Sequence, residues 1–249
     1  MTGAASIVWL DSVDSTNEEA KRRAQAGEAA PVWIAARRQT AGRGRRGRAW
    51  DSASGNLFCT LLLRPDCDPA RCAQLAFAAG LAAAETADCW VAAEDVRLKW
   101  PNDVLVAGHK AAGCLLEMGG DGQGRWLAIG VGMNLVSAPP GTLYPATHLS
   151  AHLKAGAPPP ASEVVLDRLA RAFARWFEVW ERTGFMPLRE AFLARAANLG
   201  EPVTARLADG SEQVGVFEDL DISGALVLRR SDGRRLTVAA GDVFFPPPA

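Results

Sequence analysis

Apolar positions along the first two hundred residues fall into short strand-like runs and longer helix-like periods. The strand-like runs, bounded by polar or glycine-containing turns, lie at 7–10, 31–36, 56–63, 96–99, 104–106, 111–118 and 126–132. The helix-like segments, in which apolar residues recur every three or four positions, lie at 15–26, 69–87, 162–183 and 187–197. The central strands follow one another through short turns. This indicates a mixed, mostly antiparallel sheet covered by helices.

The pattern changes after Gly200. Short alternating strands between about 201 and 245 are separated by turn pairs at Asp209–Gly210, Ser223–Gly224 and Asp232–Gly233, which is typical of a small β-barrel. We therefore predict an α+β fold with two domains, one over residues 1–198 and a small C-terminal β-barrel over residues 199–249. A chain of 249 residues can hold one large domain and a small companion.

Composition excludes several classes of protein. Hydrophobic residues make up 49% of the chain and charged residues 22%, which is ordinary for a globular protein. The formal net charge is -1, so the surface as a whole is not suited to wrapping a polyanion. The chain has neither a signal-peptide pattern at its start nor an apolar run approaching the roughly 20 residues of a membrane span. We expect a cytoplasmic protein without a membrane partner.

Cysteine and histidine give no sign of a disulfide framework or a metal centre. The five cysteines contain no CxxC pair, and we expect them to be buried thiols. His148 and His152 are four residues apart, but no Glu follows His148 as a metalloprotease helix would require.

The segment QTAGRGRRGRAW, residues 39–50, concentrates positive charge. Six arginines lie between Arg37 and Arg48, in a stretch without apolar periodicity that predicts a long functional loop. Guanidinium groups match phosphate oxygens, and glycines let backbone N–H groups approach an anion, so a triphosphate site is reasonable. A flexible basic loop explains the composition equally well. The GxGxxG spacing within it is not followed by a helix, which argues against a dinucleotide site.

The segment KWPND, Lys99–Asp103, contains a Pro-Asn-Asp turn and is followed closely by Lys110. Two of the four lysines of the chain, Lys99 and Lys110, therefore flank this turn. Asp103 could bind a hard cation, Asn102 could orient a phosphate or carboxylate, and a lysine could stabilise a developing anion. From the pattern alone, a simple hairpin turn is the more economical interpretation.

Two further motifs are weaker. In DSTN, residues 14–17, Ser15 and Glu18 have the spacing of a capping box, which leaves Thr16 and Asn17 available for a polar ligand. GVGMN, residues 130–134, by itself is a strand that ends in a turn.

Together these motifs resemble those of the biotin protein ligase family. The shared segments, in order, are DSTN, QTAGRGRRGRAW, GNLF, KWPNDV with HKAAGCLLEM, GVGMNL and GVFEDLDISGALVL. The resemblance covers essentially the whole chain. It implies a catalytic domain similar to that of class II aminoacyl-tRNA synthetases, followed by an SH3-like barrel. Some members carry an N-terminal DNA-binding domain, but only thirteen residues precede Asp14, so we expect the monofunctional form without specific DNA binding.

The resemblance also implies the reaction. Biotin and ATP, with Mg²⁺, would form biotinyl-5′-AMP, and the biotinyl group would pass to a lysine of a biotin carboxyl carrier protein. The carrier would belong to acetyl-CoA carboxylase or a similar biotin-dependent carboxylase. The sequence leaves both a monomer and a homodimer open.

The resemblance assigns each site residue a role. Those implied to bind biotin are Ser15, Thr16, Asn17, Gln39, Arg43, Gly113 and Leu115. Those implied to bind ATP are Arg43, Arg45, Arg46, Trp50, Lys99, Asn102, Asp103, Lys110 and Asn134. Lys110 and Arg45 are expected to act in the chemical step, and Asp103 to hold Mg²⁺.

Three alternatives remain at this point. A lipoate protein ligase would share the fold and the adenylate chemistry, but not the GRGRRGR loop. A nucleic-acid-binding module could use the arginine run, although the rest of the chain is neutral and few aromatic residues accompany it. An inactive scaffold is disfavoured because each motif is intact.

Overall fold

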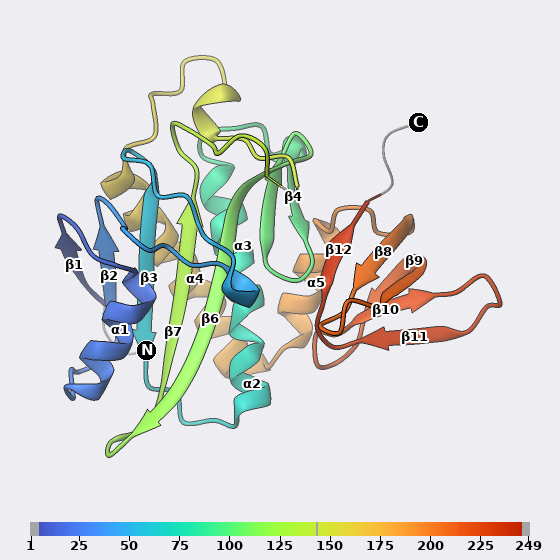
Figure 1. Cartoon of the computed structure of the whole chain (residues 1–249), viewed down its shortest axis with the longest axis horizontal. Coiled ribbons are helices and arrows are strands. Elements are labelled where there is room, and N and C mark those ends of the chain that lie inside the picture. Colours follow the sequence, from blue (N-terminus) through green and yellow to red (C-terminus); the bar gives the residue numbers. More distant parts are fainter. Residues whose placement is uncertain (1–4, 143, 246–249) are drawn as a thin grey trace.

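The computed structural model describes residues 5–142 and 144–245, and the outer ends of both predicted domains, 1–4 and 246–249, lie outside these ranges (Figure 1). A seven-stranded sheet forms the larger part, in the order β1-β2-β3-β7-β6-β5-β4. Its strands are β1 (Ser6–Leu10), β2 (Val32–Ala36), β3 (Leu57–Leu63), β4 (Val96–Lys99), β5 (Asp103–Val106), β6 (His109–Asp121) and β7 (Gly124–Met133). Among these strands only β1 and β2 pair in parallel, which confirms the predicted mixed, mostly antiparallel sheet.

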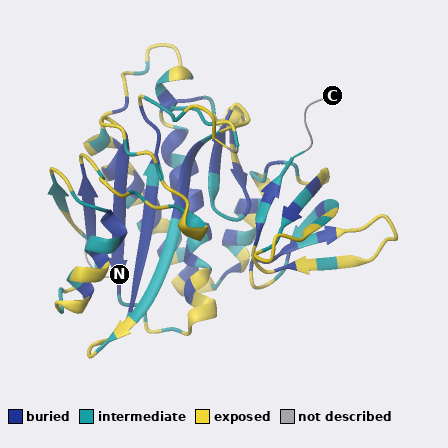
Figure 2. Ribbon diagram, in the orientation of Figure 1, coloured by how far each residue is buried: buried dark blue, intermediate teal, exposed yellow. Residues whose placement is uncertain are grey.

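Helices cover both faces of this sheet. In β2 every residue is buried: Trp33 and Ala35 belong to the main core, while Val32 and Ile34 belong to a smaller cluster on the opposite side. The main core packs against α3 (Leu75–Ala87) and α4 (Ser162–Thr183), and the smaller cluster packs against α1 (Thr16–Gln25). Figure 2 shows the resulting buried centre. Continuous burial along β2 explains why its sequence does not alternate.

The predicted helix over 69–87 is wrong in one respect, because it is divided. A short helix α2 (Pro69–Ala73) is separated from α3 by Gln74. Here the backbone hydrogen bonds tighten to three-residue spacing, from Gln74 N to Arg71 O and from Phe77 N to Gln74 O. The Gln74 side chain also accepts a hydrogen bond from Trp180 Nε1 at 2.9 Å. Contact with α4 therefore fixes the position of the break.

The last predicted helix of the larger part also ends early. It is α5 (Met186–Ala194) rather than 187–197. Arg195 O accepts from Leu98 N, and Ala197 N donates to Leu98 O, each at 2.8 Å. At these residues, hydrogen bonds to the free edge of β4 replace further helical hydrogen bonds. The local sequence does not show this pairing, because β4 is about one hundred residues away in the chain.

The C-terminal domain is a five-stranded antiparallel sheet, as the sequence predicts for the barrel. Its strand order is β11-β10-β9-β8-β12. The strands are β8 (Pro202–Arg206), β9 (Glu212–Leu220), β10 (Leu226–Arg229), β11 (Arg235–Val238) and β12 (Asp242–Phe244). It docks on the larger part through an Arg189–Asp219 ion pair and a hydrogen bond from Trp100 Nε1 to Gly224 O at 2.9 Å.

The expectation of buried thiols holds for three of the five cysteines. Cys59, Cys72 and Cys114 are buried, but Cys67 is half-buried and Cys89 is exposed, so the prediction of five buried thiols is wrong for these two. Within residues 5–142 and 144–245, no helix is long and apolar enough to cross a membrane. The same ranges contain no cluster of three or more His, Cys, Asp or Glu suited to a metal ion.

The domain interface depends on the absence of a side chain at Gly224. This residue has φ +88, and a Cβ there would lie 2.6 Å from a ring carbon of Phe77. Gly233 has a similar φ of +81 but open space around it. We expect Gly224→Ala to lower the free energy of unfolding by about 2–4 kcal/mol through backbone strain plus overpacking. Gly233→Ala should lower it by only about 1 kcal/mol through strain alone. Urea denaturation measures both, and equal losses would contradict the clash.

Candidate active site

One cavity of about 410 Å³ lies where the arginine loop, the N-terminus of α1, strands β3 to β7 and the C-terminal domain meet. It brings together all but one of the site residues predicted from the sequence. Those that line it are Ser15, Thr16, Asn17, Gln39, Arg43, Arg45, Trp50, Lys99, Asn102, Asp103, Lys110, Gly113, Leu115 and Asn134. The exception, Arg46, donates instead to Leu207 O and pairs with Asp242.

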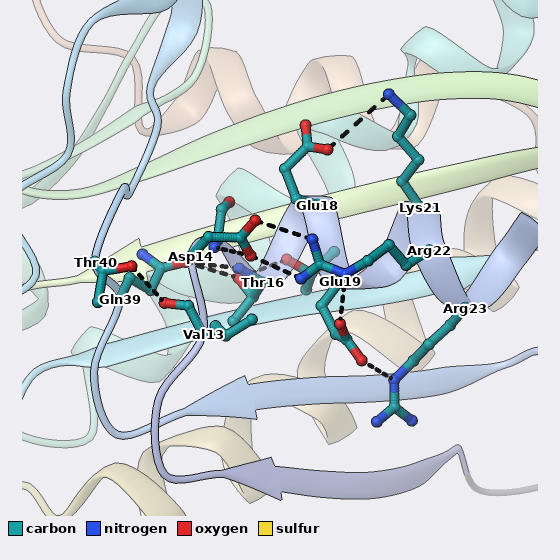
Figure 3. Close-up of polar contacts among 12 residues, drawn as sticks. Val13, Asp14, Thr16, Glu18, Glu19, Lys21, Arg22, Arg23, Gln39 and Thr40 are labelled. Carbon is teal, nitrogen blue, oxygen red and sulfur yellow. Dashed lines mark hydrogen bonds and ion pairs between the residues drawn. The ribbon is translucent and has the colours of Figure 1, made fainter.

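The N-terminus of α1 does not form the capping box that the sequence predicts. Ser15 is the N-cap residue, but its side chain makes no capping hydrogen bond within the described chain, and Glu18 pairs with Arg43. Asp14 instead accepts from Ser15 N and from Arg22, and this guanidinium lowers the pKa of Asp14 to about 2 (Figure 3). The buried Ser15 hydroxyl is therefore left at the cavity wall rather than used by the helix.

Gln39 ties the arginine loop to α1. Its Oε1 accepts from Thr16 N at 2.8 Å and lies 3.2 Å from Thr16 Oγ1 (Figure 3). Its Nε2 donates to Ser52 Oγ at 3.1 Å. A backbone N–H can only donate, so the oxygen of the Gln39 amide is fixed toward Thr16. One N–H of Nε2 goes to Ser52, which leaves the second N–H as a donor for a ligand.

Asn17 crosses from α1 to the middle of the sheet. Its Nδ2 donates to Leu115 O at 3.3 Å and to Glu117 Oε2 at 2.8 Å, while its Oδ1 accepts from Thr60 Oγ1 at 2.6 Å. Sequence reasoning missed Thr60 and Glu117. The signal for Thr60 was present: it is the one hydroxyl in the apolar run LFCTLLL of β3. Glu117 carries no such local signal.

Glycines of the central strands let other groups approach the sheet. A Cβ at Gly132 would lie 2.5 Å from the Trp50 ring, and one at Gly113 would lie 3.1 Å from it. These two glycines are paired across β6 and β7, so the Trp50 ring lies over both strands. The Lys110 Nζ is 5.4 Å from the centre of the same ring. The GVGMN segment is therefore more than a strand end, because the absence of a side chain at Gly132 lets the Trp50 ring contact the strand.

A carboxylate between two lysines forms the charged part of the cavity. Asp103 Oδ1 lies 2.6 Å from Lys110 Nζ, and Asp103 Oδ2 lies 3.7 Å from Lys99 Nζ. Burial lowers the pKa of Lys99, whose ammonium also lies 4.0 Å from the centre of the Tyr144 ring. Asn102 is held by a bond from its Nδ2 to Cys114 O at 2.6 Å. The KWPND turn is thus a cluster of fixed charges, not only a hairpin.

The arginine loop is held across the cavity by the C-terminal domain. It contains a turn, η1 (Arg45–Gly47), closed by a bridge between Arg43 and Ala49. Asp242 of β12 lies 2.8 Å from Arg48, 3.3 Å from Arg46 and 3.8 Å from Arg45. Partial burial would raise the pKa of Asp242, but these three arginines hold it below its ordinary value. Sequence reasoning missed Asp242 because it is almost two hundred residues from the loop.

Arg45 and Asn134 complete the lining. Arg45 Nη1 donates to Asn102 Oδ1 at 3.3 Å and to Gly241 O at 3.2 Å, and burial lowers its pKa. Buried Asn134 donates from Nδ2 to Thr147 O at 3.0 Å, and Thr147 N in turn donates to Lys110 O. The cavity therefore has a polar end at α1, which we call the uncharged end because Arg43 at its edge is paired with Glu18 and Glu117, and a strongly charged end at β4–β5.

Comparisons with known proteins agree with this geometry. Residues 9–134 match the model of the Biotin/lipoate A/B protein ligase family, and residues 199–245 match that of the Biotin protein ligase C terminal domain. The chain is 45% identical to a biotin--[acetyl-CoA-carboxylase] ligase of Paracoccus denitrificans, over 95% of this chain and 99% of the relative. A ligase of the same name from Mycobacterium tuberculosis is 34% identical, over 92% of this chain and 85% of the relative.

Solved structures are similar as well. The biotin protein ligase of Aquifex aeolicus in complex with biotin and ATP has a TM-score of 0.78 and 25% identity, covering 96% of this chain and 97% of that one. The biotin protein ligase of Leishmania major in complex with biotinyl-5-AMP has a TM-score of 0.67 and 27% identity, covering 94% of this chain and 99% of that one. Sequence motifs, fold and cavity thus lead to one conclusion: the chain belongs to the biotin/lipoate A/B protein ligase family.

Proposed function

We propose that this chain is a biotin protein ligase that works in two steps at the cavity. First, the biotin carboxylate attacks the α-phosphorus of ATP, which forms biotinyl-5′-AMP and releases pyrophosphate. Then a lysine amine of a carrier protein attacks the mixed anhydride, and AMP leaves. The observation that carries the proposal is the joining of an uncharged polar pocket to a cluster of lysines and arginines in one cavity.

The uncharged end is suited to the ring system of biotin. Ser15, Thr16, Asn17 and Gln39 supply hydrogen-bonding groups, and Gly113 and Leu115 line the cavity from β6. Arg43 lies at the edge, paired with Glu18 and Glu117. A few convergent polar groups in a partly apolar pocket are the usual arrangement for a small-molecule site.

The charged end is suited to the triphosphate and the reacting carboxylate. Both reactants are anions, so their approach requires positive charge more than a general base. Lys99, Lys110 and Arg45 lie at this end, with Asn102 held beside Arg45. Asn134 and Trp50 are the groups that we assign to the nucleoside.

The residues at this end also fit a Mg²⁺ ion. Asp103 Oδ1 is buried 2.6 Å from Lys110 Nζ, and its remaining lone pair faces no other hydrogen-bond donor among the described residues. Mg²⁺ typically uses one or two carboxylates and completes its shell with water and phosphate oxygens. Asp103 would hold it, and the bound ion would neutralise phosphate charge.

The partner is proposed from the names of the relatives. The relatives from Paracoccus denitrificans and Mycobacterium tuberculosis are named as biotin--[acetyl-CoA-carboxylase] ligases, and we propose the same class of carrier here. A lipoate ligase is the second candidate within the family, because the matching model covers both activities. The hydrogen-bonding groups at the uncharged end favour biotin, since the dithiolane ring of lipoate has no N–H or C=O.

The first test is the exchange of labelled pyrophosphate into ATP. We expect exchange with biotin, and none above background with lipoate or octanoate, because only biotin has N–H and C=O groups that can bond to the uncharged end and so hold its carboxylate at the charged end. Exchange that is equal with lipoate and biotin would overturn the assignment.

A second test concerns Lys110. Replacing it with Gln should slow adenylate formation by about a hundredfold or more, because a lost charge at a transition state typically costs several kcal/mol. Lys21→Gln, on the exposed face of α1, is the matched control and should behave as the parent. Single-turnover kinetics of adenylation measure both. A rate for Lys110→Gln near that of the parent would return Lys110 to a structural role.

A third test treats the arginine loop as a lid over the reactive anhydride. Arg45→Gly removes the bonds to Asn102 and Gly241 and adds backbone freedom, so adenylate should still form but escape several times faster. Arg45→Ala removes the same guanidinium without that freedom and should leak less. Labelling of lysines on bystander proteins reports the escape. Failure of Arg45→Gly to form adenylate would place Arg45 in the chemical step, and parent-like retention would refute the lid.

A further inference from the structure

We infer that Thr60 and Glu117 are positioning residues that make Asn17 an obligate hydrogen-bond acceptor toward the substrate, and that this acceptor selects the urea N–H of biotin. The inference rests on the proposed function and extends it to two side chains that contact Asn17 but do not themselves line the cavity. Neither was predicted from the sequence. Thr60 is fully buried behind the cavity, and Glu117 is a half-exposed carboxylate at its edge.

The register of the sheet places both groups around Asn17. Gly130 of β7 is paired with Thr60 of β3 on one side and with Leu115 of β6 on the other. Asn17 lies directly over this glycine, since a Cβ at Gly130 would be 2.3 Å from Asn17 Oδ1. Its amide therefore spans from the β3 side chain to the β6 backbone.

The partners of Asn17 fix which way its amide points. Leu115 O and the Glu117 carboxylate can only accept, so both N–H groups of Nδ2 are directed to them, at 3.3 and 2.8 Å. The opposite orientation would bring three oxygens together. Asn17 consequently has no N–H left for a ligand.

The single proton of the Thr60 hydroxyl is also committed. Asn17 Oδ1, 2.6 Å away, can only accept, so Thr60 donates to it. Thr16 Oγ1 lies 2.8 Å from the same hydroxyl oxygen and 3.2 Å from Gln39 Oε1, and its own proton can be donated to either of these acceptors. Oδ1 of Asn17 keeps one lone pair, and this acceptor is what Asn17 presents to the cavity.

Packing alone would favour an apolar residue at position 60. The strand reads LFCTLLL and each of its residues is buried, so valine would fill the same volume without a hydroxyl. A buried hydroxyl is costly unless it is hydrogen-bonded, and the side chains that bond the Thr60 hydroxyl, Thr16 and Asn17, both belong to the DSTN motif. The hydroxyl at position 60 is therefore explained by its hydrogen bonds to the cavity residues Thr16 and Asn17 and not by packing.

The acceptor on Asn17 and the free N–H of Gln39 form a complementary pair. A cyclic urea offers N–H donors beside a C=O acceptor, whereas an alkyl or dithiolane group offers neither. A site built to hydrogen-bond a substrate group rejects an analogue that lacks it far more strongly than an apolar pocket could. Orientation of Asn17 is thus a source of selectivity, not only of affinity.

The test variant is Thr60→Val, which keeps the side-chain volume and removes the hydroxyl. The matched control is Thr60→Ser, which keeps the hydroxyl and removes a methyl group. In pyrophosphate exchange we expect Thr60→Val to raise KM for biotin about tenfold, from the loss of one orienting hydrogen bond, with KM for ATP and kcat within about twofold. Desthiobiotin keeps the urea but lacks the sulfur, so its KM should rise by the same factor in Thr60→Val. Thr60→Ser should restore the KM for biotin, although its cavity lowers the melting temperature.

Several results would overturn the inference. They are an unchanged or lower KM for biotin in Thr60→Val, an equal rise in KM for ATP, a desthiobiotin effect of different size, or a Ser variant as impaired as the Val variant. In each of these cases the parent protein still shows biotin-dependent exchange, so the proposed function stands. An inactive parent would instead refute the proposed function itself.

Discussion

The close packing of α1 on the middle strand of the sheet is the contact on which the active site depends. Asn17 occupies the space where any residue but glycine at position 130 would have its Cβ. A side chain there would force the helix N-terminus away from β3 and β6, whose groups bind the Asn17 amide. Gln39 is tied to the same helix end through Thr16. The uncharged half of the cavity therefore depends on one close approach between helix and sheet.

The charged half is organised by carboxylates that come from other elements. Buried or half-buried cations require nearby negative charge, because the loss of their hydration is otherwise uncompensated. Asp103 supplies it to Lys99 and Lys110, and Asp242 supplies it to the arginine loop. These carboxylates allow the cations to gather in one place in the absence of phosphate. A triphosphate that enters brings charge of the same sign as the carboxylates and can replace part of their pairing.

The C-terminal domain is consequently part of the active site and not an appendage. Asp242 and Phe244 both line the cavity. Arg45 also donates to the backbone of Gly241, just before β12. The position of the arginine loop is therefore coupled to the docking of this domain, which in turn depends on the fit of Gly224 beside Phe77 and Trp100.

The sequence by itself determined the elements, the two-part architecture and most of the residues that line the cavity, because hydrophobic periodicity, turn residues and motif spacing are local properties. Its errors fell where tertiary contacts replaced local preference: Gln74 divides a helix, residues 195–197 pair with β4, and Ser15 does not cap α1. Only the tertiary structure identified Asp242, Glu117 and Thr60. The lone hydroxyl of Thr60 in an apolar strand is visible in the sequence, but its partners are not. Each of the three residues acts on residues at least 43 positions away, and the strand register and domain docking that bring them together leave no pattern in a single sequence.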